Sequence, residues 1–385
     1  MIPTLASRMN FLFCQAAVGI FLWEQGDMGT IPFPVQRAEE SDMKEIITES
    51  MKSLKEAIGF SGTALARNKD EMLVNFSGGY ANRSEGIRNR ADTRFGIASG
   101  CKLFTAVAIC QLVEKGQLSY DSRLQDCLPL EFKHFDPEIT IHHLLTHTSG
   151  IPDYFDEETM DNFEDLWTHY PMYRVRRPQD FLPLFADKKM KHEVGRVFHY
   201  NNGGYIVLGL VVEHLSGLAF SDYVEKFIFA KAGMMDSGYF EADCLPERAA
   251  VGYIDQEDGS WKTNVFSLPA KGGPDGGAYV TAPDMTRFWE SLMTFELLSE
   301  ETTAALLQPH VHITNDIYYG YGLRMKLRQQ DVEKYILMGY DPGVNFRSVY
   351  YPEEARSIVV CSNKSGGAFE IISGIEQECT GQKRG

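Results

Sequence analysis

The stretch Phe95-Gly96-Ile97-Ala98-Ser99-Gly100-Cys101-Lys102 leads into a strongly apolar run that ends at Glu114. This run predicts a helix, and Lys115-Gly116 supplies its stop signal. On a helix, Ser99 and Lys102 share one face, so the amine can reach the hydroxyl. A serine needs a base beside it to act as a nucleophile, and a lysine serves as that base only if its surroundings lower its pKa. The spacing alone is weak evidence, because an N-cap serine and a solvated lysine give the same pattern.

The segments on either side of this stretch predict an α+β fold. An amphipathic helix is expected over 41–58, followed by strands over 62–67 and 72–80. Residues 121–269 look mainly helical and loop-rich, and strands return before a last helix that starts at Phe369, over 321–327, 334–338, 346–351 and 357–361. Early and late strands are therefore expected to share one antiparallel sheet, flanked by N- and C-terminal helices, with a mainly helical lobe inserted.

The predicted domain organisation follows from that order. Residues 41–385 are expected to form one catalytic domain, with an α/β lobe over 41–118 and 271–385 and a helical lobe over 119–270. Substrate sites tend to lie where two such lobes meet. Residues 1–40 are expected to be an extension or a weak signal or anchor, because the apolar stretch 9–23 is short for a membrane span.

Net charge and cysteine content limit the classes of partner and the compartment that we expect for this chain. The net charge of −16 argues against a nucleic-acid partner, since sequence-blind binding needs a basic surface. The seven cysteines include no C-x-x-C pair, which argues against a zinc or redox motif. Their odd number, and the position of three of them in apolar runs, predict buried free thiols in a reducing compartment and hence a cytoplasmic protein. The alternative is export or anchoring through residues 9–23, the one route to membrane contact. No metal or cofactor is expected, and the oligomeric state stays open.

A second motif, Tyr200-Asn201-Asn202, precedes another apolar helix that begins near Gly203. A phenol beside a lysine ammonium can be held close to the phenolate form and relay a proton. The amide of Asn202 can bind a substrate carbonyl. Taken alone, the motif also fits a turn asparagine beside an interface tyrosine.

Together these motifs resemble the β-lactamase-related serine hydrolases. That group includes class C β-lactamases, D-alanyl-D-alanine carboxypeptidases of the penicillin-binding-protein type, and esterases. The resemblance extends from about residue 60 to 375 and rests on ordered stretches, 95–102, 144–152, 200–202, 272–277, 281–285 and 319–322.

The resemblance implies a β-lactamase/transpeptidase-like fold and a small-molecule or short-peptide substrate. It makes Ser99 the acylated nucleophile and Lys102 and Tyr200 its proton-transfer partners, with the choice of base left open. Substrate would contact Asn202 and Gly339. The backbone N–H groups of Ser99 and Tyr340 would form the oxyanion hole.

The chain departs from this family at one position. The family carries a Lys or His where this chain has Leu337, and a leucine cannot pair with a substrate carboxylate. Arg347 is a candidate substitute for substrate binding. Three functions follow: a hydrolase of esters or small amides, a D-alanyl-D-alanine carboxypeptidase or β-lactamase, or a non-catalytic protein that binds a ligand or partner in the cleft.

Overall fold

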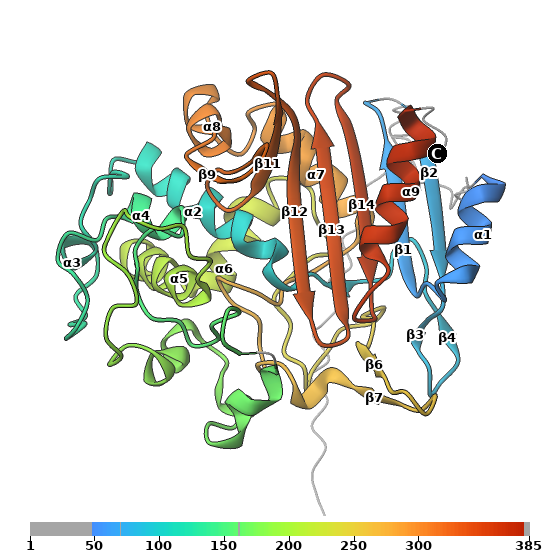
Figure 1. Ribbon diagram of the computed structural model, residues 1–385, viewed down its shortest axis with the longest axis horizontal. Coiled ribbons are helices and arrows are strands. Elements are labelled where there is room, and N and C mark those ends of the chain that lie inside the picture. Colours follow the sequence, from blue (N-terminus) through green and yellow to red (C-terminus); the bar gives the residue numbers. More distant parts are fainter. Residues whose placement is uncertain (1–47, 70, 161, 381–385) are drawn as a thin grey trace, which may run out of the picture. The chain divides into compact units, whose positions relative to one another are not determined.

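The computed structural model describes residues 48–69, 71–160 and 162–380. Its centre is an eight-stranded sheet in the order β2-β1-β14-β13-β12-β11-β10-β9, and every neighbouring pair is antiparallel. The strands are β1 (Gly62–Arg67), β2 (Met72–Gly78), β9 (Val311–Thr314), β10 (Ile317–Tyr319), β11 (Arg324–Arg328), β12 (Asp331–Asp341), β13 (Val344–Tyr351) and β14 (Arg356–Ser362). Because β1 pairs with β14, early and late strands share one sheet, as predicted (Figure 1).

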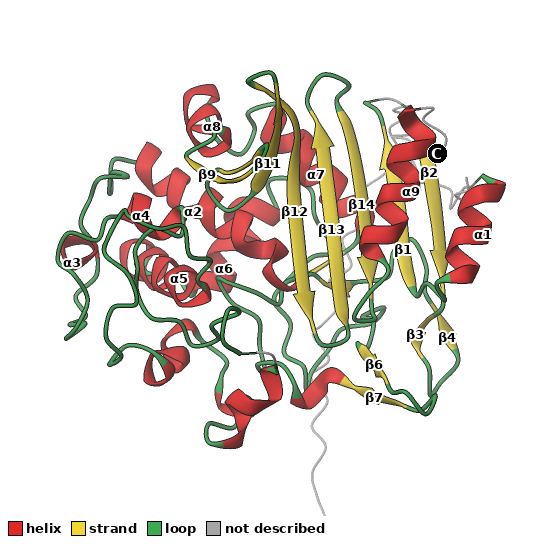
Figure 2. Ribbon diagram, in the orientation of Figure 1, coloured by secondary structure: helices red, strands yellow, loops and turns green. Residues whose placement is uncertain are grey.

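Helices cover both faces of this sheet. Helices α1 (Glu49–Ala57) and α9 (Ala368–Thr380) pack together on one face, and α7 (Ala282–Met293) contacts β1 and β14 on the other (Figure 2). Strand β14 is therefore apolar on both faces: Ile358 and Val360 join the core under α1 and α9, whereas Val359 and Cys361 join the larger core. A strand covered on both sides reads as a continuous apolar run.

The helical lobe is built around α2 (Lys102–Glu114) and α5 (Asn202–Ser216). Both are apolar around most of their circumference because they are buried on nearly all sides. Helix α2 packs on α5 and α6 of the predicted helical lobe and on α8, which belongs to the predicted α/β lobe, and the predicted lobe boundary at residue 118 stays a prediction. The other helices are α3 (Leu124–Cys127), α4 (Ile141–Leu145), α6 (Phe220–Val224), α8 (Glu300–Leu307), η2 (Phe163–Thr168), η3 (Met172–Arg174), η4 (Pro178–Leu184), η5 (Glu225–Phe229) and η6 (Asn264–Phe266).

Several local predictions need correction. The predicted single helix entering at Ser99 is a short strand, β5 (Phe95–Gly96), then the 3₁₀ turn η1 (Ala98–Cys101), then α2. Strands β9 and β10 were not predicted, because each is too short for alternation to show. Short two-stranded sheets are formed by β5 with β8 (Tyr279–Val280), β3 (Tyr80–Asn82) with β4 (Ile87–Arg88), and β6 (Tyr253–Asp255) with β7 (Trp261–Thr263).

The remaining predictions concern the N-terminal residues, the cysteines and possible membrane spans. Those for residues 1–40, and for the start of the predicted helix 41–58, lie outside the described residues. Within the described part, six cysteines are free thiols, of which four are buried as predicted, whereas Cys244 is exposed and Cys379 is half-buried. No single described helix has the length and apolar content to cross a membrane, although the bent pair formed by 202–216 and 220–229 passes that test on length and composition.

Candidate active site

Ser99 and Lys102 meet at the junction of η1 and α2. The Lys102 Nζ atom lies 2.9 Å from the Ser99 Oγ atom, the contact that their spacing predicts. The preceding Ala98 has a φ of 45°, a left-handed conformation that a residue with a Cβ seldom adopts. Such strain is typical of functional sites, where the surrounding structure enforces it.

The buried Lys102 amine has three acceptors around it. Its Nζ atom lies 2.9 Å from Ser99 Oγ, 2.8 Å from Asn202 Oδ1 and 2.7 Å from the Asp275 carbonyl oxygen. An ammonium has three N–H donors, so this environment satisfies the charged form. Burial favours the neutral amine, but the interactions with Tyr200 and Asp275 outweigh it and hold the pKa of Lys102 above its ordinary value. The lowered pKa that a lysine base requires is therefore absent in this state.

The Tyr200–Asn202 turn is held by a buried carboxylate that sequence reasoning missed. Asp153 Oδ2 accepts from the Asn202 N–H at 2.6 Å, and its Oδ1 accepts from the Gly203 N–H at 2.9 Å. These are orphan donors of the first turn of α5, which a carboxylate satisfies well. Burial raises the pKa of Asp153 to about 7, against the opposing effect of these hydrogen bonds. Asp153 directly follows the 144–152 motif, which was the available signal.

The Tyr200 ring lies between the two basic groups of the site. Its centroid is 4.9 Å from Lys102 Nζ and 5.4 Å from the Arg324 guanidinium. Within the described chain, no direct hydrogen bond joins the Tyr200 hydroxyl to Ser99 in this conformation. Proton-transfer contacts are often long in a free enzyme and tighten when substrate binds.

His147 forms a hydrogen bond to the Tyr200–Asn202 turn. Its Nδ1 accepts from the Asn201 N–H at 3.0 Å, and its Nε2 lies 2.9 Å from the Tyr319 hydroxyl. Since Nδ1 is an acceptor, the Nε2 proton faces Tyr319, and both ring nitrogens are engaged. Burial lowers the pKa of His147 well below its usual value, so the ring stays neutral.

The Asn202 amide, which binds the lysine that contacts Ser99, already has hydrogen-bond partners. Its oxygen accepts from Lys102, and its Nδ2 lies 3.3 Å from the Phe155 carbonyl oxygen. In this conformation Asn202 holds the lysine. Nδ2 also lies 3.4 Å from Asp153 Oδ2, so the predicted contact with a substrate carbonyl requires release of one of these two bonds.

Strand β12 passes directly in front of Ser99. A Cβ on Gly339 would lie 2.0 Å from the Ile97 carbonyl oxygen, so only a glycine permits this approach. Asp341 pairs with Val344 across the turn at Pro342-Gly343. By antiparallel alternation, the Tyr340 N–H then points away from β13. That edge of β12 is open, because pairing with β11 stops at Ile336. The predicted oxyanion role of Tyr340 fits this geometry.

A cleft of about 340 Å³ opens beside Ser99 and Tyr200. It is lined by Arg347, which pairs with Met338 across β12 and β13, and by Arg324 of β11. In the described part of the chain, neither guanidinium forms an ion pair or hydrogen bond. Leu337 is buried beside Ser99, Lys102 and Tyr200, so no charge comes from that position. Arg324 was not predicted, and nothing local in the sequence marks it.

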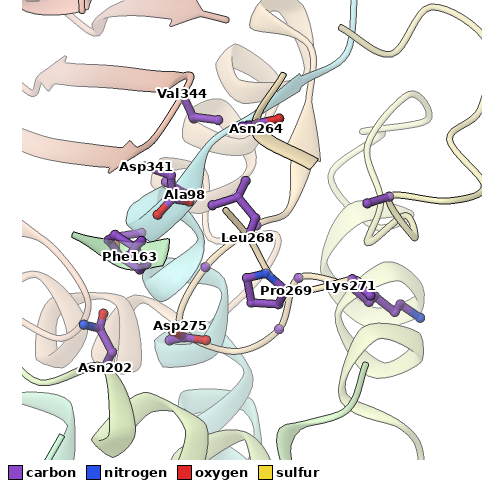
Figure 3. A pocket seen from close by; sticks show the side chains of 18 of the residues that line it. Ala98, Phe163, Asn202, Asn264, Leu268, Pro269, Lys271, Asp275, Asp341 and Val344 are labelled. Atoms are coloured by element: carbon purple, nitrogen blue, oxygen red, sulfur yellow. The ribbon is translucent and has the colours of Figure 1, made fainter. Parts of the chain in front are cut away.

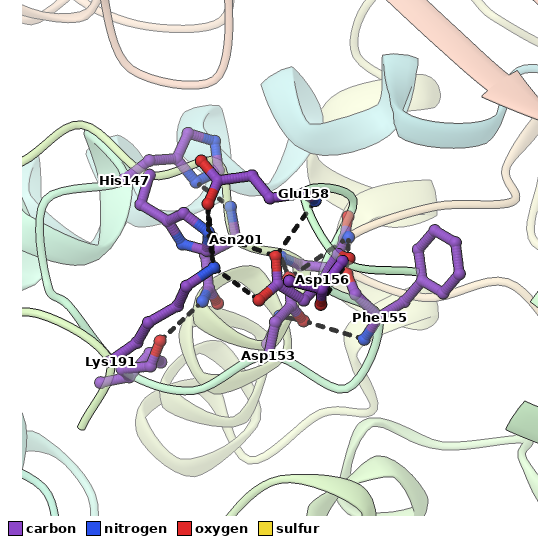
Figure 4. Close-up of polar contacts among 12 residues, drawn as sticks. His147, Asp153, Phe155, Asp156, Glu158, Lys191 and Asn201 are labelled. Atoms are coloured by element: carbon purple, nitrogen blue, oxygen red, sulfur yellow. Dashed lines mark hydrogen bonds and ion pairs between the residues drawn. The ribbon is translucent and has the colours of Figure 1, made fainter. Parts of the chain in front are cut away.

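A cluster beside the site has the spacing of a metal centre. Oxygen and nitrogen atoms of Asp156, Glu158 and His199 lie within 4.8 Å of one another. The Lys191 Nζ atom lies among them, 2.5 Å from Asp156, 3.0 Å from Glu158 and 2.7 Å from the His199 ring (Figure 4). The lysine therefore supplies the positive charge, and the cluster fastens the loop around Asp156 to the segment that carries Tyr200.

Comparison with known proteins agrees with this geometry. The sequence matches the Beta-lactamase family over residues 43–375. The chain belongs to the beta-lactamase family. A solved penicillin-binding protein from Bacillus halodurans is 56% identical, with a TM-score of 0.82, and the match covers 85% of this chain and 99% of that one.

Two curated relatives of this beta-lactamase-family chain extend the comparison. Penicillin-binding protein 4* of Bacillus subtilis is 28% identical, with 84% of this chain and 73% of the relative covered. Esterase EstB of Burkholderia gladioli is 32% identical, with 53% of this chain and 52% of the relative covered. The predicted β-lactamase/transpeptidase-like fold and the serine hydrolase family are thereby confirmed. The individual site residues stay predictions.

Proposed function

We propose that Ser99 forms an acyl-enzyme with short peptides, amides or esters whose leaving group carries a carboxylate. The observation that carries this proposal is the pair of guanidiniums, Arg324 and Arg347, in the cleft that Ser99 and Tyr200 also line. Arginine binds carboxylates through two parallel hydrogen bonds, and both side chains are available for that. They supply the positive charge that Leu337 does not.

The state of Lys102 favours Tyr200 as the base. The three acceptors around the Lys102 amine suit an ammonium, which has no lone pair with which to take the Ser99 proton. Tyr200 accepts the proton as Ser99 Oγ bonds to the substrate carbonyl carbon. The oxyanion forms between the N–H groups of Ser99 and Tyr340. Tyr200 then protonates the leaving group as its bond breaks, and water releases the acyl group by the reverse sequence.

The relatives support the substrate class. The protein from Bacillus halodurans that is 56% identical to this chain is named a penicillin-binding protein. We therefore propose peptides ending in D-alanyl-D-alanine as the first substrates to try.

A second candidate is a hydrolase of uncharged esters. It is favoured by Leu337, a buried apolar residue beside Ser99, Lys102 and Tyr200 that supplies no charge for a substrate carboxylate. The similarity to Esterase EstB points the same way.

Labelling with a p-nitrophenyl alkylphosphonate tests the shared chemistry. We expect one adduct by intact mass, located on Ser99 by peptide mapping, and none in Ser99→Ala. A folded protein that never gains the adduct would refute acyl transfer and leave a binding role.

Substrate charge separates the two candidates. For a carboxylate-dependent hydrolase, a peptide ending in D-alanyl-D-alanine is cleaved faster than its C-terminal amide. Arg324→Gln should reduce that preference about tenfold, as expected for a lost charge-assisted hydrogen bond. The matched control is Arg328→Gln on the same strand, where the side chain is 73% exposed. Equal cleavage of both peptides, with faster turnover of neutral esters, would favour the esterase.

A further inference from the structure

Ser99 lies between two pockets, and the position of Tyr200 assigns a role to each. Tyr200 lines the cleft with the two arginines, whereas the second pocket is lined without it, and the two pockets share Ser99, Glu157, Phe163 and Tyr340. The group that protonates the leaving group must face it. The leaving group therefore lies in the arginine cleft and the acyl group in the second pocket, called the acyl pocket below.

The acyl pocket combines apolar walls with acidic groups. Its apolar lining comes from well-separated segments, Phe163, Phe181, Phe240, Leu268, Pro269 and Val344. Its carboxylates are Asp275, Asp341 and Glu157. Lys271 also borders it, but its Nζ lies 3.2 Å from Ser221 Oγ and its side chain points away (Figure 3). An apolar group that also carries a positive charge fits such a lining.

Asp341 is the carboxylate that lacks a partner. The Asp275 carboxylate accepts a hydrogen bond from the Tyr154 hydroxyl. Among the described residues, Asp341 forms no side-chain hydrogen bond or ion pair, although it follows Tyr340 directly and faces the pocket (Figure 3). Burial, and then the charge of Asp275, raise the pKa of Asp341 to about 8. Asp341 is half-buried, so water can reach it in the empty pocket, and a ligand cation beside it would replace that water with a charge-assisted hydrogen bond.

We propose that the acyl pocket selects an acyl group with an apolar chain that ends in an ammonium, and that Asp341 binds this ammonium. The inference rests on the proposed acyl transfer at Ser99. It adds a specificity residue and a substrate class, a cationic acyl donor.

A matched pair of phosphonates tests it. Both are ethyl p-nitrophenyl phosphonates, with an aminobutyl arm in one and a pentyl arm of equal length in the other. Ser99 Oγ bonds to phosphorus, p-nitrophenolate leaves, and its release is followed by absorbance. We expect the aminobutyl reagent to label Ser99 about tenfold faster, the effect of one charge-assisted hydrogen bond.

Two variants test whether Asp341 causes the faster labelling by the aminobutyl reagent. Asp341→Asn, which nearly preserves shape, should bring the two labelling rates together, and labelling by the pentyl reagent reports that the variant is folded. Asp331→Asn, at the exposed opposite end of β12, makes the same change of charge and should keep the preference. Equal rates in the unmodified protein, or a preference that survives Asp341→Asn, would overturn the inference. Failure of both reagents to label would instead refute acyl transfer.

The pH dependence gives a second readout. Asp341 faces Asp275, Glu157 and the Lys102 ammonium, and it binds a cation only when ionised. With a pKa of about 8 in the empty pocket, ionisation increases as pH rises, so the aminobutyl preference should grow between about pH 6 and about pH 8. A preference that is flat over this range in the unmodified protein would contradict the role of Asp341.

Discussion

Gly339 shows how one missing side chain allows β12 to contact η1, the turn that carries Ser99. A Cβ there would lie 2.0 Å from the Ile97 carbonyl oxygen, well inside contact distance. We predict that Gly339→Ala forces β12 away from η1 and separates the N–H groups of Ser99 and Tyr340. Loss of one oxyanion donor costs about 100-fold in rate, and we expect at least that drop in the acylation rate.

The matched control is Gly366→Ala. At that position a Cβ would meet no atom within 4 Å, so acylation should keep its normal rate. An acylation rate in Gly339→Ala equal to that of the unmodified protein would show that β12 is not part of the oxyanion hole.

Also at the residue scale, Lys102 has more contacts than its spacing from Ser99 predicts. The spacing of Ser99 and Lys102 predicts their contact, which the structure contains at 2.9 Å. It does not predict the acceptors from Asn202 and Asp275, which come from distant parts of the chain. Because those acceptors, together with Tyr200 and Asp275, surround the amine, tertiary contacts determine its protonation.

At the scale of elements, the N-terminus of α5 depends on Asp153. We predict that Asp153→Ala leaves the buried N–H groups of Asn202 and Gly203 without acceptors, because Asp153 is their partner. Such a loss costs about 2–3 kcal/mol, and displacement of the Tyr200 turn should also lower the acylation rate. Urea unfolding and phosphonate labelling measure the two effects.

Asp187→Ala is the control for this prediction. Asp187 is exposed and has no hydrogen bond or ion pair in the described chain, so its removal should change neither quantity. Unchanged unfolding of Asp153→Ala would show that water replaces the carboxylate as acceptor.

Among the elements, long apolar helices and long strands were predicted best. Helices α2 and α5 carry strong apolar runs with clear stop signals, and β14 reads as a continuous apolar strand. The 3₁₀ turn at Ser99 was not predicted, because its geometry depends on contact with β12 and on the strained Ala98. Local pattern carries no information about such contacts.

At the scale of the whole described domain, an ion-pair network joins distant segments. Asp236 Oδ1 lies 2.7 Å from Arg94, just before β5, and also binds Arg248. We predict that Asp236→Asn lowers the free energy of unfolding by about 1–2 kcal/mol, since the network is partly exposed and charge-assisted. Thermal unfolding measures this.

Glu193→Gln removes an exposed pair with Arg196 and serves as the control. It should leave the melting temperature unchanged. If Asp236→Asn has the same melting temperature as the control variant, solvent screening cancels the stabilisation predicted for the ion-pair network.

The amino-acid order alone was enough to predict the fold and the contact between Ser99 and Lys102. These features rest on periodicity and on short motifs, which are local properties of the chain. Tertiary structure determined the rest: Arg324 in the cleft, Asp153 under the Tyr200 turn, and the unpartnered Asp341 in the acyl pocket. Each of these depends on which side chains face a shared space after folding. Sequence separation does not encode that, because residues far apart in the chain approach one another only when the sheet and the helical lobe close around the site.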